Sequence, residues 1–518
     1  MALPSHEAAD TYVQQAGSAC ALPGQASGEP CTIVIFGASG DLTNRKLIPA
    51  LFSLHGSASL PARFTIVGCS RTAMHHEEFR ARLREACAGH PAFTVERWES
   101  FAASLFYQPL VYDSQPSFVE LARFLAELDQ ERQTGGNRLF YLAIPPSLYP
   151  VVAGLLGTVG LATEGNNMGW TRIVVEKPFG RDLATAMELD RRLHQNFREH
   201  QIFRIDHYLA KETVQNILML RFANTIFEPL WNRSFIDSIG IIAGEKLGVE
   251  HRAGYYEQAG VLRDMFQNHM MQLLALIAME PPSLFEADRV RDEKVKVYRA
   301  LKPFVADGLQ ENLILGQYNA GRIDGMPVPG YRDEPGVTPA SLTPTFAMMR
   351  LFIDNWRWRG IPFYLVSGKR LPAKLTRIEV QFKEVPHSMF RDVLGGQINA
   401  NRLVLGIHPQ EEITLSFQAK QPGARVCLQP VTMDFKYDEK FKGPSPDAYE
   451  KVLLDCILGD QMLFWRQDGV ELCWSFLSPI LAACETCRDQ AGLLHPYPAG
   501  TWGPEQAAAW LQLINEPN

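Results

Sequence analysis

One short stretch, residues 204–212, concentrates side chains that can hold or move charge. Five of them lie within eight residues: Arg204, Asp206, His207, Tyr208 and Lys211. Four apolar residues follow at helical spacing: Val214, Ile217, Leu218 and Phe222. They predict a buried helix, whose N-terminus offers free N–H groups and partial positive charge to an anion such as a phosphate. A solvated, salt-bridged turn would have the same composition, so the stretch alone supports both interpretations equally.

A second candidate for proton chemistry is His269, on a helix predicted over residues 260–279. His269 lies on the apolar face of this helix, with Leu262, Met265, Phe266, Leu273, Leu276 and Ile277. A histidine on such a face is more often a hydrogen-bonded core residue. The alternative is a shielded general base, which needs a carboxylate to orient its ring. Asp206 is the carboxylate that we expect in that role.

A dinucleotide-binding fold is predicted near the N-terminus. The apolar strand 31–36 is followed by the glycine-rich turn 37–42, and then by a helix with leucines on one face. The turn has the spacing G-x-x-G, so an ordinary strand-to-helix turn explains it about as well. Arg71 follows the next strand, at the place where such folds recognise the adenosine ribose; with Arg45 it favours NADP over NAD. A surface arginine is the alternative.

Two further apolar strands, 138–144 and 171–175, complete the pattern of this first domain. Ligands of open α/β sheets bind beyond the carboxyl ends of the strands. Lys177 follows the second of these strands and Tyr141 lies on the first, so both are candidates for the site. A surface lysine at a strand end is an equally common explanation for Lys177.

The pattern changes near residue 205. Predicted strands now cluster without regular crossover helices, which indicates an α+β domain with a large antiparallel sheet. We therefore expect a mobile tail over 1–30, a Rossmann-type domain over 31–205 and an α+β substrate and dimerisation domain over 206–518. Lys369 and Lys374 follow the apolar strand 361–366 and offer cations to a phosphate, unless they are solvated loop lysines.

Composition excludes several classes. With 518 residues, 46% hydrophobic residues, a net charge of -7 and a pI near 6.0, the chain does not resemble a general binder of nucleic acid or membrane surfaces. It has no apolar run long enough for a membrane span and no secretory signal pattern. Nine scattered cysteines suit a reduced, cytoplasmic protein, and we interpret the pair Cys484 and Cys487 as chance neighbours on a helix.

Taken together, the motifs resemble the glucose-6-phosphate dehydrogenase family. They occur in family order from about residue 31 to the end, and the combination is highly specific. The matching segments are residues 37–42 with 45–47, 140–146, 176–180, 203–209, 221–224, 231–233, 263–269, 367–369 and 459–464.

The resemblance implies oxidation of β-D-glucose 6-phosphate at C1 to 6-phospho-D-glucono-1,5-lactone, with hydride transfer to NADP and without a metal, as the first step of the oxidative pentose phosphate pathway. His269 matches the catalytic base, Asp206 its orienting partner, and Lys177 a residue between substrate and nicotinamide. The matching coenzyme positions are Gly37, Ser39, Gly40, Asp41, Leu42, Arg71, Tyr141 and Lys177. The matching substrate positions are Lys177, His207, Tyr208, Lys211, Glu245, Asp264, Lys369 and, more loosely, Lys374.

The chain departs from the family pattern at three places. His408 stands where glutamine is usual, Glu257 stands where aspartate is usual, and residues 375–406 do not preserve the basic set that binds a second NADP in some members. A homodimer or homotetramer is expected from the resemblance alone. The remaining alternatives are a related sugar oxidoreductase with another substrate and an inactive NADP-binding regulatory protein.

Overall fold

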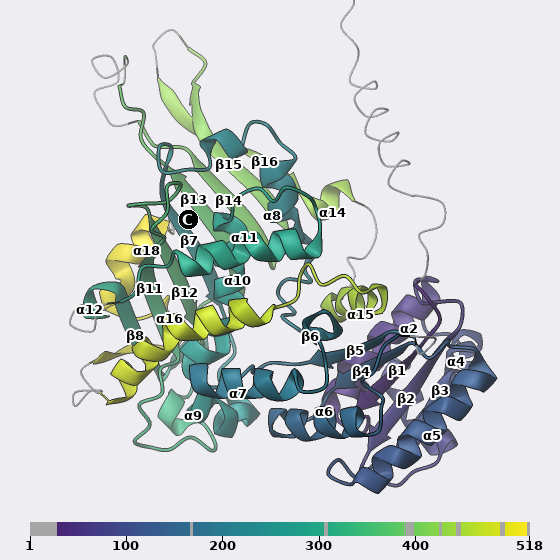
Figure 1. The fold of residues 1–518 in the computed structure, drawn as a ribbon. Helices are drawn as coiled ribbons and strands as arrows, with labels where there is room; N and C mark the ends of the chain where they lie inside the picture. The colour runs from purple at the N-terminus through teal and green to yellow at the C-terminus, as the bar shows by residue number, and fades with distance from the viewer. Residues whose placement is uncertain are drawn as a thin grey trace, which may run out of the picture. The chain divides into compact units, whose positions relative to one another are not determined.

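The computed structural model describes residues 28–165, 169–304, 309–387, 389, 398–423, 427–441, 447–486 and 493–514. The expected N-terminal tail therefore lies almost wholly outside the described residues, as does Cys487. The chain forms two compact units (Figure 1). The first comprises Met1–Val174 and Leu453–Asp460, and the second comprises Val175–Val452 and Gln461–Asn518.

The first unit is built on a twisted sheet with the strand order β3-β2-β1-β4-β5. β1 pairs in parallel with β2 and β4, and β2 pairs in parallel with β3. Every residue of β1 is buried, as expected for a parallel strand whose two faces are both covered. The Rossmann-type prediction is thus confirmed. The strands are β1 (Cys31–Phe36), β2 (Phe64–Ser70), β3 (Leu105–Pro109), β4 (Arg138–Leu142) and β5 (Thr171–Val175), and the helices are α2 (Ile48–Gly56), α3 (His76–Cys87), α4 (Val95–Ala102), α5 (Gln115–Arg132) and α6 (Tyr149–Thr158).

The second unit contains a nine-stranded sheet with the order β16-β15-β14-β13-β7-β12-β11-β8-β17. Most neighbouring strands are antiparallel, which confirms the predicted α+β class, but β12 pairs with β7 and β17 with β8 in parallel. β8 lies within residues 302–340, a segment rich in glycine and proline. The strands are β7 (Ile236–Gly244), β8 (Leu313–Asn319), β11 (Phe346–Phe352), β12 (Pro362–Gly368), β13 (Leu375–Phe382), β14 (Arg402–His408), β15 (Glu412–Lys420), β16 (Leu428–Lys436) and β17 (Leu494–Pro498), with a separate pair β9 (Gly321–Ile323) and β10 (Met326–Val328).

The helix predicted over residues 260–279 is not one continuous α-helix. Gly260, near the end of α9 (Ala253–Val261), has a φ of +59° and kinks the chain. A π-helix, Leu262–Met270, follows and continues into α10 (Met271–Ala278). Every residue of α10 is buried, because this helix packs among its neighbours α8 and α11. The other helices are α7 (Leu183–Leu193), α8 (Glu212–Phe222), α11 (Ala287–Arg299), α12 (Leu309–Asn312), α14 (Tyr437–Lys440), α15 (Ala448–Leu458), α16 (Gln467–Thr486) and α18 (Ala508–Ile514), and a shorter π-helix spans Thr43–Leu47 in the first unit.

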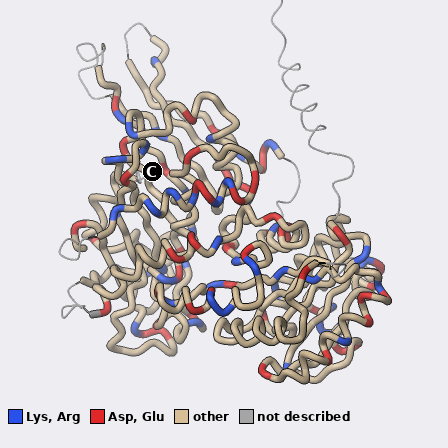
Figure 2. The backbone as a smooth tube through the Cα atoms, in the orientation of Figure 1, with Lys and Arg blue, Asp and Glu red and all other residues tan. Residues whose placement is uncertain are grey.

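Charged residues of both signs alternate along the backbone of both units (Figure 2). Within the described ranges, no helix combines the length and the apolar character that crossing a membrane requires.

Gly37, which opens the glycine-rich turn, generates a prediction about stability. Its φ is +85°, and a Cβ at this position would overlap the backbone carbonyl of Ala143. Gly37→Ala should therefore destabilise the fold by more than about 1 kcal/mol and lower the midpoint of thermal unfolding. The matched control is Gly154→Ala, inside α6, where a Cβ has no heavy atom within 4 Å. It should be neutral or stabilising by up to about 1 kcal/mol, and equal midpoints for the two variants would contradict the prediction.

Candidate active site

The candidate site of the second unit is built around a hydrogen bond between Asp206 and His269. Asp206 lies just after β6 (Ile202–Arg204), and His269 lies in the π-helix. His269 Nδ1 is 2.6 Å from Asp206 Oδ1, and the backbone N–H of Tyr208 donates to the same oxygen over 3.0 Å. Both side chains are buried. The structure thus brings together two residues that sequence spacing could not connect.

The pKa values of this pair follow from burial and mutual charge. Burial raises the pKa of Asp206, but its interaction with His269, with which it shares a hydrogen bond, outweighs burial and lowers the pKa to about 2. Burial also lowers the pKa of His269 below its ordinary value, although Asp206 opposes that effect. The pair therefore consists of a carboxylate and a neutral imidazole at neutral pH. If Nδ1 carries the ring proton that Asp206 accepts, Nε2 is left as a base.

Lys177 lies on the Nε2 side of His269. Its Nζ is 3.0 Å from His269 Nε2 and 3.2 Å from Asp264 Oδ1. The π-helix explains how one amine reaches both residues. Asp264 and His269 are five residues apart, which would place them about 140° from each other around an α-helix. A π-helix joins residues five apart and brings them to the same side.

Asp264 is a carboxylate surrounded by cations. Burial raises its pKa, but Lys177, Lys369 and Arg252 lower it well below its usual range. The hydroxyl of Tyr255 donates to Asp264 Oδ1 over 3.3 Å. Tyr255 was not among the predicted site residues, because it lies on α9, beyond the break at Gly260, where helical periodicity gives no signal.

Glu245 and Lys369 form a second pair of predicted residues. Each is the residue directly after a strand, β7 and β12 respectively, and these strands are parallel with Gly244 opposite Gly368. The backbone N–H of Glu245 donates to the Gly368 carbonyl over 2.9 Å, and the two side chains form an ion pair. Lys369 Nζ also lies 5.0 Å from the ring centroid of Tyr256. The register of two parallel strands therefore sets the position of both side chains.

The remaining donors of the charged stretch surround the N-terminus of α8. Lys211 precedes this helix directly, and its Nζ lies 4.6 Å from the centroid of the Tyr208 ring, which stacks on His269 at 4.0 Å. His207 packs edge-on against His269 at 4.9 Å, and burial lowers its pKa to about 3. Burial and the charge of Lys374 lower the pKa of Lys211. The geometry offers a helix N-terminus and several donors to an anion.

His408 lies in this same group. Burial lowers its pKa first, and then the charges of Lys374 and Lys211. The second departure from the family pattern, Glu257, is elsewhere: it accepts hydrogen bonds from Tyr331 at 2.5 Å and Ser341 at 2.7 Å.

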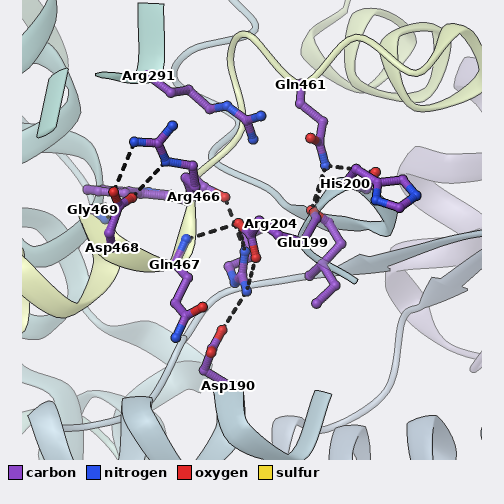
Figure 3. A network of polar contacts seen from close by, with 12 residues as sticks. Asp190, Glu199, His200, Arg204, Arg291, Gln461, Arg466, Gln467, Asp468 and Gly469 are labelled. Atoms are coloured by element: carbon purple, nitrogen blue, oxygen red, sulfur yellow. Dashed lines mark hydrogen bonds and ion pairs between the residues drawn. The ribbon is translucent and has the colours of Figure 1, made fainter. Parts of the chain in front are cut away.

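Arg204, the first charged residue of the stretch, does not join the others. Its guanidinium is buried between Asp190 and Glu199, at 2.5 Å and 2.8 Å, as Figure 3 shows. His194 bridges the same two carboxylates, and hydrogen bonds to Asp190 and Glu199 raise its pKa to about 10. Asp190, His194 and Glu199 lie close enough together to suit a metal, but in this structure the imidazole of His194 pairs with both carboxylates. The network is therefore an anchor.

All of the predicted coenzyme residues except Lys177 lie in the first unit. The Gly37 N–H donates to the Cys69 carbonyl over 2.8 Å, so the turn 37–42 sits beside the end of β2. Arg71 follows this strand and is exposed. Ser39, Gly40, Asp41 and Leu42 continue the turn into the π-helix that precedes α2. Tyr141 is wholly buried within β4, one residue before its end.

Family models and curated relatives that match this chain over most of its length all come from one family. The family model described as "Glucose-6-phosphate dehydrogenase, NAD binding domain" matches residues 34–216, and that described as "Glucose-6-phosphate dehydrogenase, C-terminal domain" matches residues 218–516. The glucose-6-phosphate 1-dehydrogenase of Aggregatibacter actinomycetemcomitans is 47% identical over 479 residues, covering 92% of this chain and 95% of the relative. That of Bacillus subtilis is 42% identical over 477 residues, covering 92% and 95%.

Solved structures agree. A glucose-6-phosphate dehydrogenase in complex with glucose 6-phosphate is 35% identical, with a TM-score of 0.86 over 95% of this chain and 99% of the other. The Mycobacterium avium enzyme is 32% identical, with a TM-score of 0.80 over 95% and 98%. The two family models, over residues 34–216 and 218–516, include every residue of the site described above. The chain therefore belongs to the glucose-6-phosphate dehydrogenase family.

Proposed function

We propose that the protein oxidises β-D-glucose 6-phosphate at C1 to 6-phospho-D-glucono-1,5-lactone and that NADP is its hydride acceptor. Family membership supports the reaction. The observation that carries the chemistry is the buried Asp206–His269 pair, whose Nε2 atom faces the cation of Lys177. A protected base of this kind suits removal of a hydroxyl proton.

His269 takes the proton of the C1 hydroxyl on Nε2. Its lowered pKa keeps the imidazole neutral before the reaction, so the base is ready at physiological pH. Asp206 remains a carboxylate and stabilises the imidazolium that forms. Lys177 lies within 3.2 Å of Asp264 and is held where negative charge develops on the C1 oxygen.

The residues of the first unit fit a dinucleotide. NADP, when bound, supplies the acceptor for the hydride that leaves C1. The positive φ of Gly37 gives the turn after β1 the tight backbone conformation that glycine supplies in dinucleotide-binding folds. Exposed Arg71 offers its guanidinium to the 2′-phosphate that distinguishes NADP from NAD. We propose Ser39, Gly40, Asp41, Leu42 and Tyr141 as further coenzyme residues of this unit, and Lys177 of the second unit as a residue that also contacts the coenzyme.

The substrate would be held at both of its ends. We propose that His207, Tyr208, Lys211 and Lys374 bind the phosphate, and that Glu245, Asp264 and Lys369 bind sugar hydroxyls. The charges at the N-terminus of α8 support the first group, and the strand register of Glu245 and Lys369 supports the second. The domain limits, cytoplasmic location and homo-oligomeric state expected from the sequence are likewise proposals.

Activity with and without the substrate's phosphate tests the function. Purified protein mixed with glucose 6-phosphate and NADP should form NADPH, followed by absorbance, and unphosphorylated glucose should be a far poorer substrate. Lys211→Met should raise KM for glucose 6-phosphate at least about tenfold, because it removes a charge-assisted contact, while leaving the rate with glucose nearly unchanged. Equal rates with both sugars in the unaltered protein would favour an oxidoreductase for another sugar. No turnover with any sugar would favour an inactive regulator.

The role of His269 as the base is tested by His269→Asn. The variant keeps a polar side chain but has no basic nitrogen, so kcat should fall about 10²–10⁴-fold. In the unaltered enzyme, kcat/KM should decline on the acid side with an apparent pKa below 6.5, since the lowered pKa delays protonation of the imidazole. A variant that retains full kcat would remove His269 from this role.

Arg71 generates a prediction about coenzyme choice. Arg71→Ala removes the guanidinium proposed for the 2′-phosphate, so KM for NADP should rise at least about tenfold while KM for NAD changes little. Arg63→Ala, an exposed arginine of the same unit before β2, is the matched control and should change neither value. Equal weakening of NADP and NAD by Arg71→Ala would show that Arg71 does not recognise the 2′-phosphate.

A further inference from the structure

One lysine of the second unit is buried without a hydrogen-bond partner among the described residues. Lys294 lies on α11 and is 3% exposed. Within the described part of the chain, its Nζ has no hydrogen-bond partner. Removing an ammonium group from water costs several kcal/mol unless an opposite charge compensates. Its position therefore requires an explanation in terms of charge.

Asp206 supplies that opposite charge. Asp206 Oδ1 accepts from His269 and Tyr208, but Oδ2 is buried and has no partner among the described residues. Among the groups that raise the pKa of Lys294, Asp206 has the largest effect. The unpartnered oxygen and the unpartnered amine thus belong to groups that attract each other in a buried environment.

The geometry of α11 directs this side chain inward. Lys294 and Tyr298 are four residues apart and share one face of the helix, and the charge of Asp206 affects both. The Tyr298 hydroxyl lies 3.5 Å from Gln272 Oε1, three residues beyond His269, and its ring stacks on Trp465 at 5.7 Å. This face of α11 therefore packs against the helices that position the base.

We propose that Lys294 is a positioning residue that holds Asp206 as a carboxylate directed at His269. Its positive charge acts on a carboxylate whose Oδ1 is engaged by His269 and whose Oδ2 is buried without a partner among the described residues. The inference rests on the proposed role of His269 as a base. Lys294 touches neither substrate nor coenzyme in this proposal and acts only through Asp206.

The charges around Lys294 agree with this assignment. Burial and then the charge of Arg291 lower the pKa of Lys294 to about 7, and Asp206 opposes both effects. Arg291 on the same helix, Cys473 on α16 and Arg466 just before α16 are the other groups that face Lys294. On the acid side of the activity profile, below pH 6.5, Lys294 is therefore protonated. A positive charge there reduces the affinity of the Asp206–His269 pair for a proton.

Lys294→Met tests the proposal, because methionine has a similar volume and no charge. The acid limb of kcat/KM should move about 0.5–1 unit to higher pH, kcat should fall about tenfold, and KM for glucose 6-phosphate should change little. The melting temperature should equal or exceed that of the unaltered protein, since a buried charge is replaced by an apolar group. Lys296→Met is the matched control: Lys296 is exposed on the same helix and pairs with Glu293. It should leave kcat, KM and the pH profile unchanged.

Lys294→Gln, which keeps polarity without charge, provides the same comparison if the methionine variant does not fold. An acid limb that does not move in either variant would overturn the proposal, as would a fall in melting temperature with an unchanged profile. NMR titration of the His269 ring, assigned with His269→Asn, should show the same upward shift in pKa without any substrate. This measurement separates the two proposals: an inactive protein with a shifted His269 pKa would refute the function but support Lys294.

Discussion

The site depends on one buried hydrogen bond, between Asp206 and His269. Burial alone favours the protonated form of the aspartate and does not fix the orientation of the histidine ring. The hydrogen bond of 2.6 Å counters both effects, because the carboxylate is stabilised as an anion and the ring is held in one orientation. A change of a fraction of an ångström in either backbone would weaken this bond. The surrounding structure is therefore best understood by how it fixes these two residues.

Arg204 fixes the position of the chain next to Asp206. Its guanidinium is held by Asp190 and Glu199, while its backbone carbonyl accepts from Trp465 N–H over 3.1 Å (Figure 3). Gln461 adds hydrogen bonds from its side chain to three backbone carbonyls, including that of Ile202 at 3.0 Å. The chain is thus anchored two residues before Asp206 by contacts that cannot reach the substrate. Adjacent charged residues of one stretch serve separate purposes, which explains why their types alone supported two interpretations.

Strands and turns that depend on a local sequence pattern could be predicted from the sequence. Apolar runs located β1, β4 and β5, and glycine spacing located the turn at Gly37, because both signals are set by a few neighbouring residues. The π-helix was not predictable, since its apolar residues also suit an α-helix, and only the break at Gly260 and the hydrogen-bond pattern distinguish them. The pairing of Glu245 with Lys369 depends on the register of two strands more than 100 residues apart, which no local pattern specifies. Lys294 was missed because lysine on an amphipathic helix is normally exposed.

The position of Lys177 constrains how the site must change when substrate arrives. In this structure its amine is 3.0 Å from His269 Nε2, the atom that would accept the hydroxyl proton in the proposed reaction. A hydroxyl can reach Nε2 only if it replaces this contact. Asp264 allows such an exchange, because both its side chain and its backbone carbonyl lie within 3.3 Å of the same amine and hold it nearby. In the proposed reaction the amine would remain beside the oxygen from which the proton leaves, where its charge would favour the alkoxide. The π-helix, which places Asp264 and His269 on one side, is what makes both contacts available to a single lysine.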